Sequence, residues 1–152
     1  MERCSGNGKD EGKGRGGCRA AHFLLYWTPP LAWMALIFYL SSQSNLPNFQ
    51  DYELPVKKGA HLMVYALLYF LLFRAFHARN QVRGHSLSRT YAYPALISLL
   101  YAISDEIHQS FVPFRTASFR DVIIDCVGIF LMYLALRRDI PFFGRFLRKP
   151  GA

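Results

Sequence analysis

Apolar residues along the chain come in four long blocks that are separated by shorter polar segments. The blocks cover residues 23–40, 59–73, 91–104 and 119–136, and the third is expected to continue as helix through residue 111. A helix needs about 20 mostly apolar residues to cross a bilayer, and backbone in hydrocarbon must form its own hydrogen bonds. The pattern therefore predicts an all-α integral membrane protein, a four-transmembrane-helix antiparallel bundle.

A soluble helical bundle is the alternative, because three of the blocks are short. Helices on the surface of a soluble bundle carry polar residues at helical spacing on their outer face. The stretches "LIFYL" (36–40) and "LLYFLLF" (67–73) have no such face. Hydrophobic residues make up 52% of the chain and charged residues only 18%, which also favours the membrane.

Lysine and arginine residues predict the orientation of the spans. Fourteen of the 18 lie in residues 1–21, 74–89 and 137–149, and the other four are Lys57, Lys58, Arg115 and Arg120. Basic residues near spans concentrate on the cytoplasmic side. Both termini and the middle connection should therefore be cytoplasmic, and the net charge of +8 requires no nucleic acid to explain it.

Composition divides the chain into three parts. Residues 1–21 are Gly-rich and charged and should be a disordered cytoplasmic leader, residues 22–138 should form the four-helix membrane domain, and residues 139–152 a basic cytoplasmic tail. Within "TPP" (28–30), Thr28 is predicted to cap a helix whose first positions tolerate proline, with a proline kink inside the span as the alternative. The three cysteines suggest no disulfide framework.

Ionisable and amide side chains gather at the predicted outer ends of all four spans. Such groups inside membrane segments cost roughly 2.5–3.5 kcal/mol each and usually have a functional reason. They are expected to form the walls of a polar pocket that opens on the outer face. The candidate binding residues are Lys58, His61, Asp105, Glu106, Gln109, Arg115, Asp121 and Asp125.

Helical spacing supports this convergence. One face of the second helix carries Lys58, His61 and Tyr65, at intervals of three and four residues. In the fourth helix Asp121 and Asp125 are four residues apart, and Gly128 near the same stripe would let a neighbouring helix approach closely. Asp125 needs a partner inside the bundle, for which Lys58 or Arg115 is expected.

Each candidate also has a structural interpretation. Ser118 and Asp121 match a capping box at the start of the fourth helix, which by itself would explain Asp121. Asp105, Glu106 and Arg115 would neutralise one another if they pair. A histidine such as His61 in an apolar helix is more often a hydrogen-bonded structural residue.

Three segments together resemble the VanZ-like family of small bacterial membrane proteins. The first is "IFYLSSQ" (37–43), and the second is "KGAHLMVYALL" (58–68), which fits a Lys-x-x-His-x-x-x-Tyr pattern. The third and most specific is "DEIHQSFVPFRTASFRDVIIDCVG" (105–128). Phe114 stands where the family commonly has Gly, and Lys57 stands where an acidic residue is frequent. The resemblance covers residues 27–136.

The resemblance implies a multi-pass protein of the bacterial cytoplasmic membrane. The founding member, VanZ, gives low-level protection against the glycopeptide teicoplanin, but the family implies no settled biochemical activity. No cofactor is implied. The expected partners are the lipid bilayer and, in the pocket, an anionic lipid head group or a cell-wall precursor.

Three function classes remain open on these observations. The first is a binder of an anionic or polar envelope component, with Lys57, Lys58, His61 and Arg115 as binding groups. The second is an intramembrane hydrolase or transferase that uses Asp105, Glu106 and His108 for acid–base work. Together with His61, Asp121 and Asp125 these residues could also hold a divalent metal, although they match no diagnostic metal-binding spacing. The third, a small transporter, is disfavoured because the opposite halves of the spans offer no matching polar exit.

The topology leads to a direct prediction. A reporter fused after Ala152 that is active only in the cytoplasm should be active, because the tail follows an even number of spans and is rich in arginine. A reporter that works only outside the cytoplasm, fused at the same position, should be silent. The opposite result would refute the four-span arrangement.

Overall fold

The computed structural model describes residues 11–43, 53–83, 87–113 and 118–138, with side chains for 23–43, 59–80, 89–113 and 118–138. This part of the chain forms four helices and no strand: α1 (Glu11–Ser41), α2 (Glu53–Arg83), α3 (Leu87–Gln109) and α4 (Phe119–Arg137). The predicted all-α class is therefore confirmed for the described residues. Two helices are apolar and long enough to cross a membrane, α1 over Phe23–Ser41 and α2 over Gly59–Asn80. The four-span arrangement stays a prediction.

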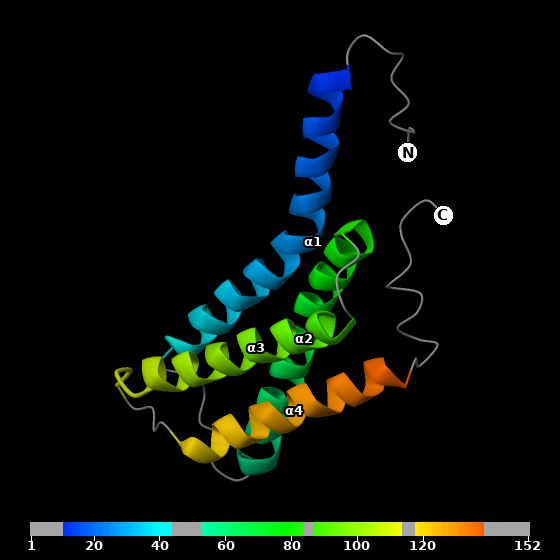
Figure 1. Ribbon diagram of the computed structural model, residues 1–152. Coiled ribbons are helices and arrows are strands. Elements are labelled where there is room, and N and C mark those ends of the chain that lie inside the picture. Colours follow the sequence, from blue (N-terminus) through cyan, green and yellow to red (C-terminus); the bar gives the residue numbers. More distant parts are fainter. Residues whose placement is uncertain (1–10, 44–52, 84–86, 114–117, 139–152) are drawn as a thin grey trace.

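Helix α2 is the centre of the fold. It packs against each of the other three helices, and its most extensive contact is with α4. Helices α1 and α3 end, and α2 and α4 begin, at the same end of the bundle (Figure 1). The chain direction thus alternates from one helix to the next. The polar residues at the end of α1, the start of α2, the end of α3 and the start of α4 are therefore brought to one end of the bundle.

The apolar core is built mainly from α2. Leu68 and Tyr69 are fully buried, and Leu72 and Phe73 on the same helix are nearly so. They pack with Ile37 of α1 and with buried residues of α3 and α4. A helix that is buried over most of its circumference needs no polar face, which explains the run "LLYFLLF" in this position.

The outer faces of the bundle are also apolar. Exposed large hydrophobic side chains occur on every helix, and on α3 and α4 they include Leu96, Leu100, Ile103, Phe119, Ile123, Phe130 and Leu131. Outer faces with so many large apolar side chains differ from the polar outer faces of helices in a soluble bundle. They fit a membrane protein.

Helix α1 differs from its prediction at two points. It begins at Glu11, inside the segment 1–21 for which disorder is predicted. It also continues through Pro29 and Pro30, so Thr28 is not a helix cap and that expectation is wrong. The early start is explained by the ease with which a nucleated helix adds further turns. The helix accommodates Pro29 and Pro30 by a bend near its middle (Figure 1).

The start of α4 agrees with its prediction in outline. Ser118 is the N-cap, and its hydroxyl accepts a hydrogen bond from the backbone N–H of Arg120 at 3.3 Å. Asp121 lies in the first turn, where its negative charge is favourable to the helix dipole. One turn beyond Asp125, Gly128 is buried against the backbone of α2, so that a Cβ at this position would collide with the carbonyl oxygen of Leu62. The close approach predicted from Gly128 is therefore confirmed.

This contact predicts that Gly128→Ala lowers the free energy of unfolding by about 1–3 kcal/mol, because the helices must move apart to admit a methyl group. Gly59→Ala on α2 is the matched control, since a Cβ there meets nothing within 4 Å. It should be neutral or stabilising by up to about 1 kcal/mol. Thermal unfolding in mild detergent, followed by circular dichroism, measures both. Equal effects of the two substitutions would contradict the close-contact role of Gly128.

Candidate functional site

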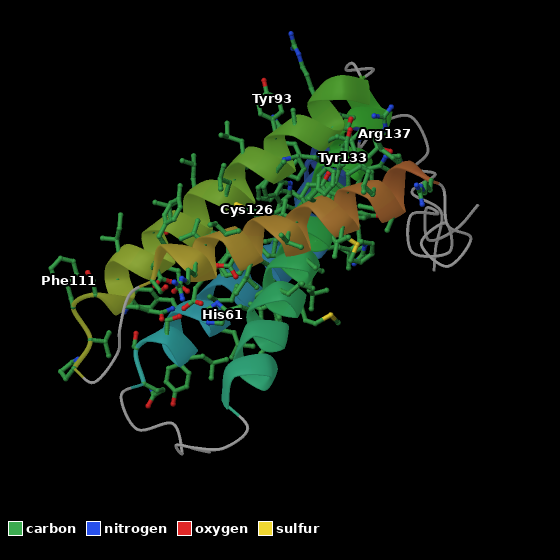
Figure 2. All side chains as sticks on the ribbon, turned by 90° about the horizontal axis from the view of Figure 1, so that it is seen from below. His61, Tyr93, Phe111, Cys126, Tyr133 and Arg137 are labelled. Atoms are coloured by element: carbon green, nitrogen blue, oxygen red, sulfur yellow. The ribbon has the colours of Figure 1, made fainter. Side chains whose placement is uncertain are left out.

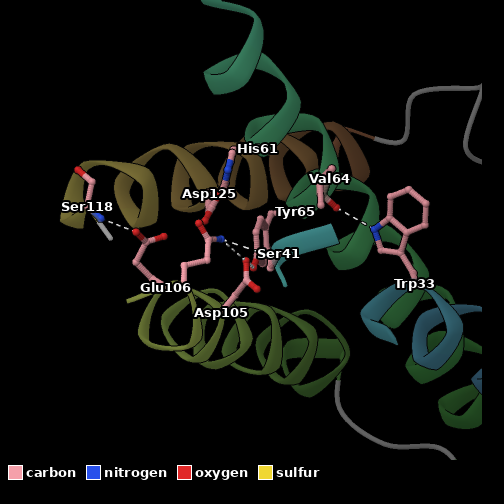
Figure 3. Close-up of polar contacts among 10 residues, drawn as sticks. Trp33, Ser41, His61, Val64, Tyr65, Asp105, Glu106, Ser118 and Asp125 are labelled. Carbon is pink, nitrogen blue, oxygen red and sulfur yellow. Dashed lines mark hydrogen bonds and ion pairs between the residues drawn. The ribbon is translucent and has the colours of Figure 1, made fainter. Parts of the chain in front are cut away.

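The deepest polar contact joins α2 to α4. Asp125 is 1% exposed, and its Oδ1 lies 3.3 Å from Nδ1 of His61 (Figure 3). Figure 2 shows His61 toward one end of the bundle, with Tyr133 and Arg137 at the other end. The expectation that Asp125 has a partner inside the bundle is confirmed. The described partner is His61, which faces Asp125 across the close α2–α4 contact; the expected contacts of Asp125 with Lys58 or Arg115 fall on side chains outside the described set.

Asp105 of α3 forms a second contact, which reaches two other helices. Its Oδ2 accepts hydrogen bonds from the Tyr65 hydroxyl at 3.2 Å and from Gln109 Nε2 at 3.0 Å. The same amide nitrogen lies 3.3 Å from the Ser41 hydroxyl of α1 (Figure 3). All of these side chains except Gln109 come from different helices, so the network ties the ends of α1, α2 and α3 together.

Glu106 has a different role from its neighbour. Its Oε1 accepts a hydrogen bond from the backbone N–H of Ser118, the residue that caps α4 (Figure 3). Glu106 is 8% exposed. A carboxylate at this position satisfies one of the free N–H groups at a helix start. Glu106 therefore connects the end of α3 to the beginning of α4.

The remaining polar residues of this end lie farther out. Asp121 is half-buried in the first turn of α4. His108 lies between Ser42 and Phe38 of α1: its Nε2 is 3.0 Å from the Ser42 hydroxyl, and its ring stacks on Phe38 at 4.4 Å. Asp105, Glu106 and His108 are thus bonded to three different segments. They do not converge on one another as an acid–base group would.

The structure says less about the predicted basic members. Lys58 is part of α2 and lies one turn before His61, but its side chain is outside the described set. Arg115 and Lys57 likewise fall outside the residues whose side chains are described. Their predicted contribution to anion binding stays a prediction. We name the described members, His61, Asp105, Glu106, Gln109, Asp121 and Asp125, the polar cluster.

A pocket of about 110 Å³ adjoins the polar cluster between α1 and α2. Its wall is mostly apolar and includes Trp33, Leu36, Leu40 and Val64. At one end the wall becomes polar, with Ser41, His61, Tyr65 and Asp105. Mostly apolar walls with a few converging polar groups are typical of small-molecule sites.

One acceptor in this wall lacks a hydrogen-bond donor. Asp105 is 5% exposed, and its Oδ1 has no hydrogen-bond partner within the protein. Asp125 Oδ1 likewise has no aligned hydrogen-bond donor, although the His61 imidazole lies beside it. A buried acceptor without a donor is unfavourable by roughly 1–3 kcal/mol. In the described part of the chain, no group of three histidine, cysteine or carboxylate side chains has the geometry to hold a metal ion.

Three hydrogen-bonding side chains that line the pocket, Trp33, Ser41 and Tyr65, were absent from the predicted set. Tyr65 shares the face of His61 at helical spacing, so its position was visible in the sequence, but its hydrogen bond to Asp105 was not. Ser41 directly follows the first apolar block. Trp33 carried no signal at all: its indole Nε1 donates to the backbone carbonyl of Val64 at 3.1 Å and holds α1 against α2.

The chain matches a known protein family. The family model described as VanZ/LLP1 matches residues 23–143, which is most of the chain. No curated protein and no solved structure matches. The family resemblance predicted from the three motifs is therefore confirmed.

The α2–α4 contact predicts that Asp125→Ala lowers the free energy of unfolding by about 3–5 kcal/mol, because a buried paired group loses its partner. The double variant with His61→Ala should lose less than the sum of the two single variants. Thermal unfolding in detergent and abundance in the membrane measure these effects.

Asp121→Ala serves as the control for this comparison. Asp121 is half-buried in the first turn of the same helix, so its loss should change stability by no more than about 1 kcal/mol. Additive effects of His61→Ala and Asp125→Ala would show that the two side chains do not support each other.

Proposed function

The chain belongs to the VanZ/LLP1 family, and we propose that it is a bacterial membrane protein that binds a polar group of a cell-envelope component. The site is the pocket beside the polar cluster. The observation that carries this proposal is the pocket itself, which is apolar along one side and lined at its end by Ser41, His61, Tyr65 and Asp105.

The proposal includes a membrane topology. α1 and α2 contain the two candidate spans, and we assign α3 and α4 to the membrane as well. Their outer faces carry exposed apolar side chains such as Leu96, Leu100 and Phe130. At 1.5 Å per residue, the 19 residues of α4 extend for about 28 Å, close to the thickness of a hydrocarbon core. Both termini would lie in the cytoplasm and the polar cluster at the outer face.

Structural need alone does not account for the polar cluster. Apolar side chains would fill the same space without the desolvation penalty of a buried carboxylate. Asp105 and Asp125 are both almost fully buried at the end of helices that are otherwise apolar. Ionisable residues in such positions commonly form a binding or reaction site.

An intramembrane hydrolase or transferase is the second candidate, with different residues from those predicted. His61 lines the pocket and touches Asp125 through Nδ1. A carboxylate that orients an imidazole in this way is a common arrangement for a general base. Asp105, Glu106 and His108 do not form such a group. The pairing of His61 with Asp125 is the observation that favours an enzyme.

Protection against teicoplanin is the proposed cellular readout. In a susceptible host in which the wild-type chain protects, Asp105→Asn should abolish protection at near-normal abundance, because it removes the charge at the end of the pocket and keeps the shape. Arg115→Gln should also lose protection if the bound component is anionic. The measurement is the growth-inhibiting concentration of teicoplanin, alongside immunoblots of the membrane fraction.

The control is Met63→Leu, since Met63 is exposed on α2 and does not line the pocket. It should protect as the wild type does. Full protection by Asp105→Asn would refute the proposed site. If Arg115→Gln protects and Asp105→Asn does not, the proposed pocket stands and an anionic ligand is excluded.

A further inference from the structure

The pocket between α1 and α2 opens toward the lateral surface of the bundle. Among its lining residues, Leu36 and Leu40 are 42% and 44% exposed, and Ala60 is also exposed. These side chains belong to the two candidate membrane spans. A molecule already dissolved in the bilayer can therefore reach the pocket sideways, without passing through water.

At the polar end of the pocket, one buried carboxylate oxygen of a lining residue lacks a hydrogen-bond donor. Asp105 Oδ2 accepts from Tyr65 and Gln109, whereas Oδ1 has no partner and the residue is 95% buried. A ligand that offers only acceptors, such as a phosphate oxygen, would leave this atom unpaired. A ligand with N–H or O–H groups would satisfy it.

The charges of the polar cluster indicate which kind of hydrogen-bond donor on the ligand is favoured. Among the side chains that the structure describes, the polar cluster contains the carboxyl groups of Asp105, Glu106, Asp121 and Asp125, with His61 as the basic member. His61 already contacts Asp125 at 3.3 Å. A cationic donor near Asp105 is favoured over a neutral or anionic one, because a charge-assisted bond to a carboxylate is about twice as strong as a neutral bond.

Size sets how much of the ligand enters. The pocket of about 110 Å³ is smaller than a cavity of roughly 150 Å³ that accepts benzene. It has room for a small head group and a few carbon atoms, while the remainder of a long molecule would lie along the exposed leucines of α1.

From these observations we infer that the pocket binds the head-group end of a membrane lipid that carries a primary ammonium, with the ammonium donating to Asp105. The inference rests on the proposed function and specifies its ligand. The lipid chain follows the apolar side of the pocket past Leu36 and Leu40.

Trp33 provides a reporter of occupancy, because it lines the pocket. With Trp27→Phe, Trp33 becomes the sole tryptophan, since the chain contains two. The full-length protein in dodecyl maltoside is titrated with lysophosphatidylethanolamine, and with lysophosphatidylcholine of the same acyl chain as the matched probe. The two heads differ in that the methylated ammonium has no N–H to donate.

We expect a saturable change in Trp33 emission with lysophosphatidylethanolamine, at a concentration at least tenfold below that needed for lysophosphatidylcholine. Asp105→Asn should remove this preference. Free ethanolamine should have no effect, because it lacks the chain. Equal response to both lipids, an unchanged preference in Asp105→Asn, or tighter binding of lysophosphatidylglycerol would overturn the inference.

Ala60→Leu gives an independent variant that fills the pocket from an exposed position, and Met63→Leu is its control on the same helix. Ala60→Leu should abolish the Trp33 response and Met63→Leu should retain it. Teicoplanin protection distinguishes a failure of the ligand assignment from a failure of the proposed site. If Ala60→Leu loses protection while both lipids bind equally, the ligand assignment fails and the proposed site stands. If Ala60→Leu protects fully, the pocket is not the working site and both fail.

Discussion

The two most deeply buried carboxyl groups at one end of the apolar bundle, those of Asp105 and Asp125, constrain how its helices pack. A carboxylate removed from water is destabilising by several kcal/mol unless partners within the protein compensate for the lost hydration. Helix α2 supplies a partner to both groups: His61 to Asp125 of α4 and Tyr65 to Asp105 of α3. These residues are four positions apart and so lie on one face of α2. Polar contacts and apolar packing therefore place α2 in the same central position.

The pairing of His61 with Asp125 depends on how closely α2 and α4 approach. Gly128 lies against the backbone of Leu62, the residue after His61. Because Gly128 follows Asp125 by three residues, the backbone contact and the polar contact are almost one turn apart on the same helix face. A larger residue at 128 would separate the helices and lengthen the 3.3 Å contact. The packing of Gly128 against α2 therefore determines how close His61 and Asp125 can approach.

The spacing of residues within one helix was sufficient to predict part of the site. The contacts between different helices could not be predicted from this spacing. The shared face of His61 and Tyr65 and the close approach at Gly128 follow from helical periodicity and from the size of one side chain. The partner of Asp125 depends on the rotation of two helices, which a single sequence does not specify. The pocket depends on how Trp33 packs across to Val64. The composition of residues 1–21 does not predict that α1 begins at Glu11, because extending a helix that is already nucleated is easier than starting one.

The interior beneath the pocket favours a binding site over a passage. Next along α2 from Tyr65 come Leu68, Tyr69, Leu72 and Phe73, all buried in the apolar core. A polar group that reached Asp105 would meet this layer before it reached the far end of the bundle, and moving it onward would require losing its hydrogen bonds to an apolar interior. Entry and exit from the same side need no such step. The apolar layer on α2 thus favours the proposed binding site over a transporter. A transporter stays the least favoured of the three function classes.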